Sequence, residues 1–295
     1  MNIAFSGSSG SLAKELIPSL EKLGCNIYRI SKSLESDGEK IFSYEDLYTN
    51  SINIRVDIFI HAASINSNLG KSGFNDEVTI SKDILRFMRL INCKNLIFFS
   101  TCKVYGEPEI NSNIIFEEST SPNPSSFYGK AKLECEKIIQ LESDNSGINS
   151  IILRLPPVLD INSSSGLGKL LSISKKIPII SLAFGEINKR SFLSINNLVT
   201  TIQKILENND SFKTNKLYNL SDSKSISLNK MLGVYTQKKP YVIPLSISKI
   251  LLYVPFLNSL FARLYGNFEI SNKLIQHELG INLHTTEHSL PIIQK

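Results

Sequence analysis

The start of the chain contains the feature that most constrains its fold, a turn with two glycines between an apolar run and a helical pattern. Ile3–Phe5 is typical of a buried strand, and Gly7 and Gly10 follow it. Leucines then recur with helical spacing as far as Gly24, a suitable residue to end a helix. A strand, a glycine turn and a helix in this order point backbone N–H groups at a phosphate. The spacing G-x-x-G-x-x-A, with Ala13 as the third small residue, differs from the usual G-x-G-x-x-G dinucleotide motif.

The first half of the chain alternates between short apolar runs and helical patterns, which predicts a doubly wound α/β fold with a parallel sheet. The predicted strands are Ile3–Ser6, Asn26–Ile30, Asp57–His61, Leu96–Ser100 and Ser150–Leu155. The predicted helices are Leu12–Leu23, Thr79–Ile91 and Phe127–Glu142. In such a sheet the ligand site is expected at the carboxyl ends of the strands.

The second half is less regular and predicts a smaller, mostly helical lobe. We expect a flexible loop at Asn162–Gly168, an extended segment at Asn188–Ile195, a helix at Asn197–Leu206 and a strand at Leu217–Leu220. Residues 1–160, with about 188–220 returning to the sheet, would form the dinucleotide-binding domain. Residues of about 161–187 and 221–295 would form the substrate lobe.

Composition excludes several classes of protein. The 295 residues carry a net charge of +5 without a clustered basic run, which argues against a nucleic-acid-binding protein. Four scattered cysteines predict neither a metal site nor a disulfide framework, and the absence of a signal peptide suggests a cytoplasmic protein. The longest apolar stretch, Tyr241–Tyr265, is interrupted by prolines and charges, so we expect no transmembrane helix. It predicts amphipathic helices packed on a core or, alternatively, a helix lying on a membrane surface.

Three segments place reactive side chains where the fold would form a site. One predicted strand ends in His61, Ala62 and Ala63, and another ends in Ser100 and Thr101. Tyr128 and Lys132 start a predicted helix, and their i, i+4 spacing puts both on one face. The same spacing occurs at Tyr28/Lys32 and Tyr235/Lys239, but only Tyr128 follows a Ser-Thr strand end and a Pro-rich loop.

Taken together, these segments closely resemble the extended short-chain dehydrogenase/reductase family, which contains nucleotide-sugar epimerases, dehydratases and reductases. The resemblance covers nearly the whole chain. The matching motifs are Gly7-x-x-Gly10-x-x-Ala13, Asp57–Ala63, Ser100-Thr101 before Val104-Tyr105-Gly106, Tyr128/Lys132, Leu153-Arg154-Leu155-Pro156, Arg190–Leu198 and Tyr218-Asn219-Leu220.

The resemblance implies a role for each matching residue. Tyr128 would be the acid/base residue at a sugar oxygen, Thr101 would hydrogen-bond that oxygen, and Lys132 would hold the nicotinamide ribose. A free phenol has a pKa of about 10, so Lys132 and the positive nicotinamide ring are expected to lower that of Tyr128. The expected cofactor-binding residues are Gly7, Ser8, Ser9, Gly10, Ser11, Leu12, Arg29, Ser31, Lys32, His61, Ala62, Ala63, Tyr128, Lys132 and Leu155. The expected substrate-binding residues are Thr101, Cys102, Pro157, Arg190, Lys169 and Arg263, with Arg190 on the substrate diphosphate.

The end of the second predicted strand bears on the choice of cofactor. Proteins that prefer NAD carry an acid there for the ribose 2′-hydroxyl. This chain has Arg29, Ser31 and Lys32 instead, which could hold a 2′-phosphate. The pattern therefore favours NADP, with NAD as the alternative.

The predicted reaction rests on three differences between this sequence and the family motifs. Cys102-Lys103 stands where the dehydratases of this family have an acid pair, and Pro157 stands where an Asn is usual. Ser194-Ile-Asn-Asn replaces the usual His-Val-Asp-Asp. We therefore predict an NADPH-dependent reductase of a UDP- or dTDP-linked 4-keto-6-deoxyhexose, of the subgroup that serves bacterial surface polysaccharides. The alternatives are a 4-epimerase of a nucleotide sugar or lipid-linked sugar with tightly bound NAD, and a non-catalytic NADP-sensing protein. The family also implies a homodimer.

Overall fold

The computed structural model describes residues 1–32, 37, 39–48, 52, 54–64, 71–110, 112–159, 166–176, 180–208, 210–251 and 261–293. The chain divides into two compact units. The first, here called the sheet unit, comprises Met1–Gly106, Ser121–Leu155 and Val199–Tyr218. The second unit comprises Glu107–Thr120, Pro156–Leu198 and Asn219–Lys295.

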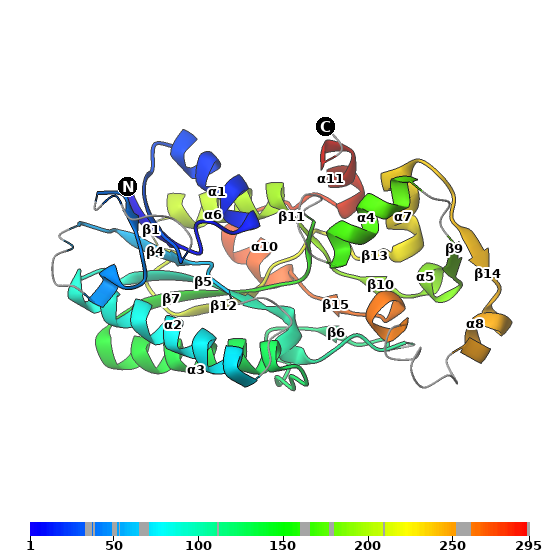
Figure 1. The fold of residues 1–295 in the computed structure, drawn as a ribbon, viewed down its shortest axis with the longest axis horizontal. Coiled ribbons are helices and arrows are strands. Elements are labelled where there is room, and N and C mark those ends of the chain that lie inside the picture. The colour runs from blue at the N-terminus through cyan, green and yellow to red at the C-terminus, as the bar shows by residue number, and fades with distance from the viewer. Residues whose placement is uncertain are drawn as a thin grey trace. The chain divides into compact units, whose positions relative to one another are not determined.

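The sheet unit is built around a seven-stranded sheet in the order β12-β7-β5-β4-β1-β2-β3. Its strands are β1 (Asn2–Ser6), β2 (Asn26–Ile30), β3 (Ile41–Phe42), β4 (Ile58–His61), β5 (Asn95–Thr101), β7 (Asn149–Leu155) and β12 (Lys216–Asn219). The neighbouring pairs from β7 to β3 are all parallel. Helix α1 (Ser11–Lys22) lies on one face, and α2 (Lys71–Leu90) and α3 (Phe127–Ser146) lie together on the other (Figure 1). The predicted doubly wound parallel sheet is therefore confirmed.

The register of the sheet brings the candidate residues to one edge. Ser6 at the end of β1 lies opposite His61 at the end of β4, and Thr101 at the end of β5 lies opposite Leu155. The strand order reverses between β1 and β4, because the chain passes from β1 out to β3 and then returns to the other side of β1. In doubly wound folds the crevice at such a reversal is the usual ligand site.

Two predicted helices have different limits. Helix α2 begins at Lys71, two turns before the predicted Thr79, and α3 continues to Ser146, where Gly147 with φ +63° ends it. The short helices η1 (Asp46–Tyr48) and η2 (Cys102–Tyr105) complete the sheet unit. The mostly apolar core beneath α2 and α3 includes Phe59, Met88, Phe98, Cys135 and Ile152, each buried.

One ion pair is fully buried between α3 and the sheet. Glu136 accepts hydrogen bonds from Arg154 at 3.1 and 2.7 Å, and both side chains are almost inaccessible to solvent. We expect Glu136→Gln to lower the free energy of unfolding by about 3–5 kcal/mol, because it leaves a buried guanidinium without its counter-charge. Urea denaturation measures this loss. The surface pair of Glu207 and Lys204 provides the control, and Glu207→Gln should leave stability nearly unchanged. Equal losses in the two variants would contradict the prediction.

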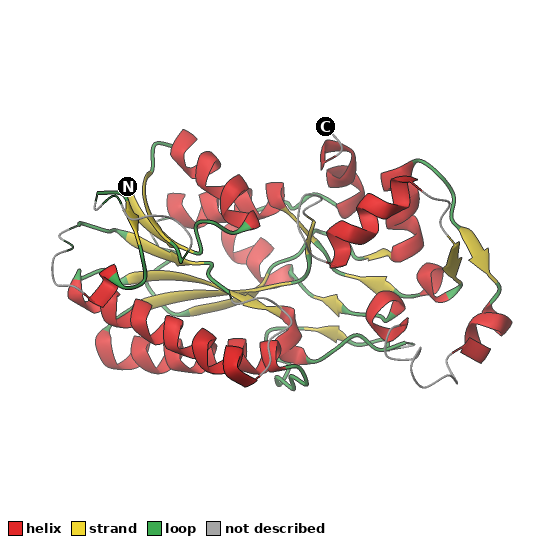
Figure 2. Cartoon of the chain, in the orientation of Figure 1, coloured by secondary structure: helices red, strands yellow, loops and turns green. Residues whose placement is uncertain are grey.

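The second unit combines helices with short strands (Figure 2). In its described part these strands pair into four two-stranded sheets. Its strands are β6 (Ile115–Phe116), β8 (Val158–Leu159), β9 (Ile180–Leu182), β10 (Lys189–Arg190), β11 (Leu193–Ser194), β13 (Ile226–Ser227), β14 (Tyr241–Ile243) and β15 (Glu269–Ile270). Its helices are α4 (Gly166–Lys176), α5 (Phe184–Ile187), α7 (Leu228–Thr236), α8 (Leu245–Leu251), α10 (Lys273–Leu279) and α11 (Thr286–Ile293). Helix α6 (Ile195–Glu207) begins in this unit and ends in the sheet unit.

A buried carboxylate organises the interior of the second unit. Asp222 accepts hydrogen bonds from the backbone and hydroxyl of Ser194, from the Asn197 amide at 2.6 Å and from Thr286 at 2.8 Å. Burial raises the pKa of Asp222, and these bonds oppose the rise. Ser194 and Asn197, which depart from the family motif, therefore have a structural role here.

Two predictions for the second unit need correction. The predicted loop Asn162–Gly168 is wrong at its end, because α4 begins at Gly166; residues 162–165 lie outside the described part. In α8 the apolar Leu245, Ile247 and Ile250 are exposed, while Ser248 is buried and donates to the Ile243 carbonyl at 3.0 Å. Of the one or two helices predicted within Tyr241–Tyr265, α8 thus does not pack through its apolar side, whereas Tyr265 at the other end of the stretch packs against a buried apolar cluster. No helix among the described residues is long and apolar enough to cross a membrane.

Candidate functional site

The glycine turn joins β1 to α1 at the edge where the strand order reverses. Gly7 has φ +77°, and a Cβ atom at this position would lie 2.6 Å from the Cα atom of Ala63. The turn is closed by a hydrogen bond of 2.9 Å from Gly10 N–H to the Gly7 carbonyl. Gly10 is the N-cap of α1 and supplies no side-chain cap, so the first N–H groups of the helix have no side-chain acceptor from that position. Ser11 and Leu12 begin the helix, and buried Ala13 packs beneath it. The turn is thus built to approach an anion closely.

Serines connect the glycine turn to the end of β2. The backbone and hydroxyl of Ser8 both donate to the Ile30 carbonyl, at 3.3 and 3.1 Å. The Ser31 hydroxyl donates to that of Ser9 at 2.9 Å, and Ser31 is buried. Lys32 is exposed beyond them. Ser31 therefore lies beside the turn just after β2, and Lys32 follows it in the chain; their predicted role at a 2′-phosphate stays a prediction.

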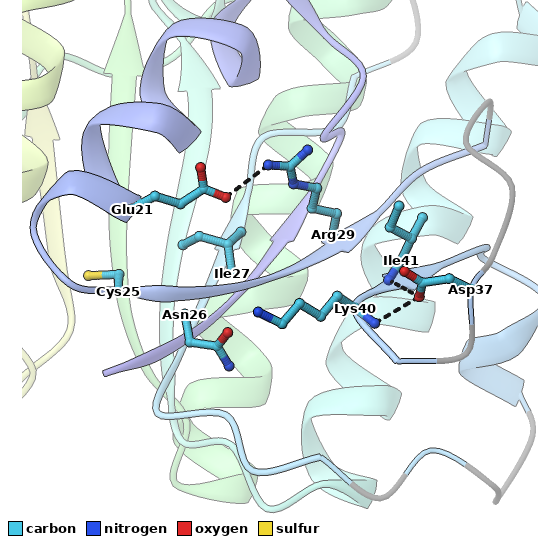
Figure 3. A pocket seen from close by; sticks show the side chains of 8 residues that line it. All are labelled: Glu21, Cys25, Asn26, Ile27, Arg29, Asp37, Lys40 and Ile41. Carbon is cyan, nitrogen blue, oxygen red and sulfur yellow. Dashed lines mark hydrogen bonds and ion pairs between the residues drawn. The ribbon is translucent and has the colours of Figure 1, made fainter.

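Arg29 does not lie at this edge. Its guanidinium pairs at 2.8 Å with Glu21, in the last turn of α1, far along that helix from the glycine turn. The two side chains help to line a cavity of about 390 Å³. Figure 3 shows the side chains that line it. The cavity is lined by Glu21, Cys25, Asn26, Ile27, Arg29, Asp37, Lys40 and Ile41. The prediction that Arg29 binds the 2′-phosphate needs correction, because the packing of α1 on β2 directs it to Glu21.

His61 is buried in a chain of polar side chains beneath the glycine turn. Its Nδ1 lies 2.8 Å from the Ser6 hydroxyl, and its Nε2 lies 3.0 Å from that of Ser81. Burial, and then the charge of Lys132, hold the pKa of His61 well below its usual value, so the ring is neutral. Both ring nitrogens are occupied by protein groups. A cofactor could therefore meet this strand end through the backbone and the alanines Ala62 and Ala63, but not through the His61 ring.

The candidate catalytic residues come together at the end of β5. Buried Thr101 ends the strand, and its hydroxyl caps η2 by accepting from Lys103 N–H at 3.3 Å. Helix α3 begins against η2, because Gly129 approaches the Lys103 carbonyl so closely that a Cβ atom would lie 2.6 Å from it. Tyr128 sits in this first turn and is partly exposed. Its hydroxyl shares a hydrogen bond with Ser64, just beyond β4.

Lys132 lies one turn further along α3, fully buried. Its ammonium contacts the Glu77 carboxylate at 2.7 Å and the Ala63 carbonyl at 3.3 Å. It also lies 4.7 Å from the centre of the Phe98 ring. Burial alone would lower the pKa of Lys132, but the Glu77 carboxylate reverses this and raises it. The ammonium therefore stays charged and is held close to Tyr128.

The pKa of Tyr128 differs in direction from the expectation. Burial raises the pKa of Tyr128, the Lys132 ammonium opposes this rise, and the Glu77 carboxylate adds to it. The predicted lowering by Lys132 is present but is outweighed. Sequence reasoning missed both Glu77 and Ser64.

Ser100 has a structural partner. Its hydroxyl donates to the Glu136 carboxylate that also holds Arg154, so this side chain is engaged in the buried network of the sheet unit. Cys102, by contrast, is buried close enough to Tyr128 to influence its pKa. Leu155 is buried at the end of β7.

Four predicted substrate-binding residues belong to the second unit. Arg190 donates to the Arg263 carbonyl at 2.6 Å, so these two arginines lie together. Lys169 is exposed on α4, and the Arg263 side chain is exposed as well. Pro157 is exposed, and its carbonyl accepts from Leu193 N–H at 3.2 Å. In the described ranges no group of three His, Cys, Asp or Glu side chains could hold a metal ion.

Comparison with known proteins identifies relatives. Residues 3–221 match the family model described as "NAD dependent epimerase/dehydratase family". A UDP-glucose 4-epimerase from Vibrio cholerae is 29% identical over 203 residues, which cover 67% of this chain and 57% of that protein. The chain thus spans less than two thirds of the length of this curated relative.

Solved structures share the fold. UDP-N-acetylglucosamine 4-epimerase from Bacillus cereus has a TM-score of 0.77 at 18% identity, covering 99% of this chain and 98% of that one. UDP-glucuronic acid 4-epimerase from Bacillus cereus, solved in complex with NAD, has a TM-score of 0.74 at 16% identity, covering 98% and 94%. At these identities the likeness concerns the fold.

Proposed function

Since the chain belongs to the NAD dependent epimerase/dehydratase family, we propose that it is a 4-epimerase of UDP-linked sugars that uses bound NAD. The observation that carries this proposal is the grouping of Thr101, Tyr128 and Lys132 at the carboxyl end of β5. The curated relative and the solved structures described above are all named as UDP-sugar 4-epimerases, which supports the choice of reaction.

The glycine turn fits a dinucleotide. A side chain at Gly7 would overlap Ala63, and the start of α1 lacks a side-chain cap at Gly10, so the turn can accept a diphosphate. Ser9 and Ser31 would line the adenosine ribose. Ala62, Ala63 and Leu155 would leave room for the flat nicotinamide, and bound NAD would accept and return a hydride at the sugar carbon.

The residues of this chain would handle the proton. Tyr128 would take the proton from the sugar 4-hydroxyl and later return it, while Thr101 would hydrogen-bond the same oxygen and orient it. Lys132 would hold the cofactor ribose with the donor that Glu77 and Ala63 leave available. In the second unit, Arg190 would bind the substrate diphosphate with a bidentate fork, assisted by Lys169 and Arg263.

The test is to denature the purified protein and measure released NAD, then to follow UDP-glucose or UDP-N-acetylglucosamine by NMR. We expect about one NAD per chain at most and a slow approach to an equilibrium of two C4 epimers, with no net consumption of cofactor. Absence of bound NAD together with unchanged sugars would overturn the proposal.

A second candidate, the NADPH-dependent 4-ketoreductase, is favoured by the neutral Ser31 at the end of β2. That position lacks the acid typical of NAD-dependent proteins, and exposed Lys32 follows it. The assay is the absorbance of NADPH on mixing with a UDP- or dTDP-4-keto-6-deoxyhexose. Stoichiometric loss would move the assignment to the reductase and to the predicted role in surface polysaccharide synthesis.

The residue at position 31 should control cofactor choice. We expect Ser31→Asp to shift the ratio of dissociation constants towards NAD by about tenfold or more, because a carboxylate repels the 2′-phosphate and accepts from the 2′-hydroxyl. Fluorescence titration with both cofactors measures the ratio. Arg29→Ala is the control and should leave it unchanged, since Arg29 is paired with Glu21. A shift caused by Arg29→Ala but not by Ser31→Asp would refute this assignment.

A further inference from the structure

Glu77 and Lys132 form an ion pair in the interior of the sheet unit. The carboxylate comes from α2 and the ammonium from α3, 55 residues later, and their oxygen and nitrogen are 2.7 Å apart. The exposed fractions of the two side chains are 2% and 1%. At such burial little water lies around the two charged groups, so solvent screens their electrostatic interaction only weakly.

The groups packed around this pair are neutral. Burial raises the pKa of Tyr44, beside the start of η1, to about 12 and that of the Cys135 thiol on α3 to about 11. His61 on β4 is neutral, because burial holds its pKa low. Cys102 on η2 is buried close to Tyr128. Among the described residues that face the Tyr128 phenol, Glu77 and Lys132 are therefore the ones that carry charge, and their charges are opposite.

We propose that Glu77 is a positioning residue that acts through Lys132, fixing the ammonium and opposing its charge at the phenol, so that Tyr128 keeps its proton until oxidised cofactor is bound. The proposal rests on the proposed function only in taking Tyr128 as the proton carrier. With Lys132 alone, the phenol would face one net positive charge. With Glu77 present the net charge of the pair is zero, so the lowering of the Tyr128 pKa by Lys132 is partly offset, and the positive nicotinamide ring would then favour release of the proton.

Geometry supports a positioning role as well as an electrostatic one. An ammonium has three N–H donors, and in this structure two point to Glu77 and to the Ala63 carbonyl at the end of β4. The Ala63 backbone also abuts Gly7 of the glycine turn. The Ala63 carbonyl therefore ties the Lys132 ammonium to the strand end against which the turn is folded, and Glu77 holds the same ammonium from α2.

The experiment is a pH titration of tyrosinate absorbance in the protein stripped of cofactor. For each variant, the spectrum of the same protein carrying Tyr128→Phe is subtracted, which isolates Tyr128 from the other nine tyrosines of the ten in the chain. In Glu77→Gln the carboxylate charge is lost, so we expect Tyr128 to titrate about one unit lower, a tenfold gain in phenolate at a given pH. Glu77→Asp keeps the charge and should titrate near the wild-type position.

If Glu77→Gln is too unstable to titrate, a double-mutant cycle with Lys132 tests the same effect on the pKa of Tyr128. Lys132→Met leaves Glu77 unopposed and should raise the pKa of Tyr128, whereas Glu77→Gln combined with Lys132→Met removes both charges and should return it towards wild type. Glu136→Gln is the matched control, since it breaks an ion pair of similar burial that does not face Tyr128. It should lower stability without moving the titration.

Enzyme kinetics supply a second readout. Oxidation of a sugar alcohol requires the phenolate, so the low-pH limb of kcat/KM should move to lower pH in Glu77→Gln by the same amount. Identical titration of Tyr128 in wild type and Glu77→Gln, or an equal shift in Glu77→Asp, would overturn the proposal. The absorbance titration needs no turnover, so it decides the role of Glu77 even if the protein proves not to be a 4-epimerase.

Discussion

Replacing Tyr128 with phenylalanine is expected to lower kcat/KM for a nucleotide sugar by about 10²–10⁴-fold, the usual contribution of a positioned proton carrier. The ring still fits the first turn of α3, so the fold should not change. Thr101 would still hydrogen-bond the sugar oxygen, but no group beside it could remove the proton. Steady-state rates and circular dichroism together separate loss of chemistry from loss of structure.

The chain contains a matched control for this variant. Tyr28 is followed by Lys32 at the same spacing as Tyr128 and Lys132, but it lies on β2 and packs against Phe42. Tyr28→Phe should leave kcat/KM within about twofold of wild type, since it keeps the ring packed against Phe42 and removes only a hydroxyl away from the site. If Tyr128→Phe retained full activity, Tyr128 would not be the proton carrier, and the proposed mechanism would fail at its central residue.

Replacing Gly7 with alanine is expected to abolish cofactor binding and to lower the free energy of unfolding by about 2–5 kcal/mol. About 1–2 kcal/mol of this comes from the left-handed backbone and about 1–3 kcal/mol from overlap with a packed neighbour. The neighbour is the backbone of Ala63, 2.6 Å from the new Cβ, and backbone cannot move aside as a flexible side chain can. Calorimetric titration with NAD and urea denaturation measure the two effects.

Gly24 distinguishes the two causes. It has φ +80°, nearly the same as Gly7, but nothing lies within 4 Å of a Cβ atom built there. Gly24→Ala should therefore show only the backbone cost of about 1–2 kcal/mol and should bind NAD normally. Equal losses in the two variants would mean that close contact between the turn and β4 contributes nothing.

The parts of the site that depend on short-range patterns could be predicted from the sequence. The glycine turn follows from the spacing of Gly7 and Gly10 between a strand and a helix, and Thr101 follows from the end of an apolar run. Tyr128 was selected over Tyr28 and Tyr235 by its place in the order of motifs, because the i, i+4 spacing itself is common. In each case the residues that matter are close in sequence or are ordered by the alternation of strand and helix.

The parts of the site that depend on tertiary packing could not be predicted from the sequence. Glu77 lies in the first two turns of α2, where residues 71–78 are mainly polar and Phe74 and Val78 alone carry apolar side chains, so the sequence pattern predicts a helix only from Thr79. An acidic residue there is typical of a solvated surface. A sequence signal for Glu77 is its position four residues before Ser81. Both residues lie on the face of α2 that continues to Ile84 and Met88, and all four side chains are buried. Its partner Lys132 is identified only once α2 and α3 are packed together.

The prediction that Arg29 binds the 2′-phosphate depended on tertiary packing in the same way. The charge of Arg29 and its place near the end of β2 match a phosphate ligand, but Arg29 lies two residues before Ser31, on the same side of the chain and about 6–7 Å further from the glycine turn. Arg29 meets Glu21 of α1, whereas Ser31 meets Ser9 of the glycine turn. Which helix residue lies over a given strand position depends on how the two elements pack.

The distribution of sulfur in this chain makes the sheet unit separately observable. Cys93, Cys102 and Cys135 are buried, Cys25 is partly exposed, and all four lie in the sheet unit. A buried thiol reacts with an alkylating reagent only when the structure around it opens, so the rates of labelling of these three report the opening free energy of that unit alone. The reagent does not label the second unit, because all four cysteines of the chain lie in the sheet unit. Mass-resolved alkylation in rising urea, compared with circular dichroism of the whole chain, would therefore reveal whether the two units unfold as one cooperative body or in separate steps.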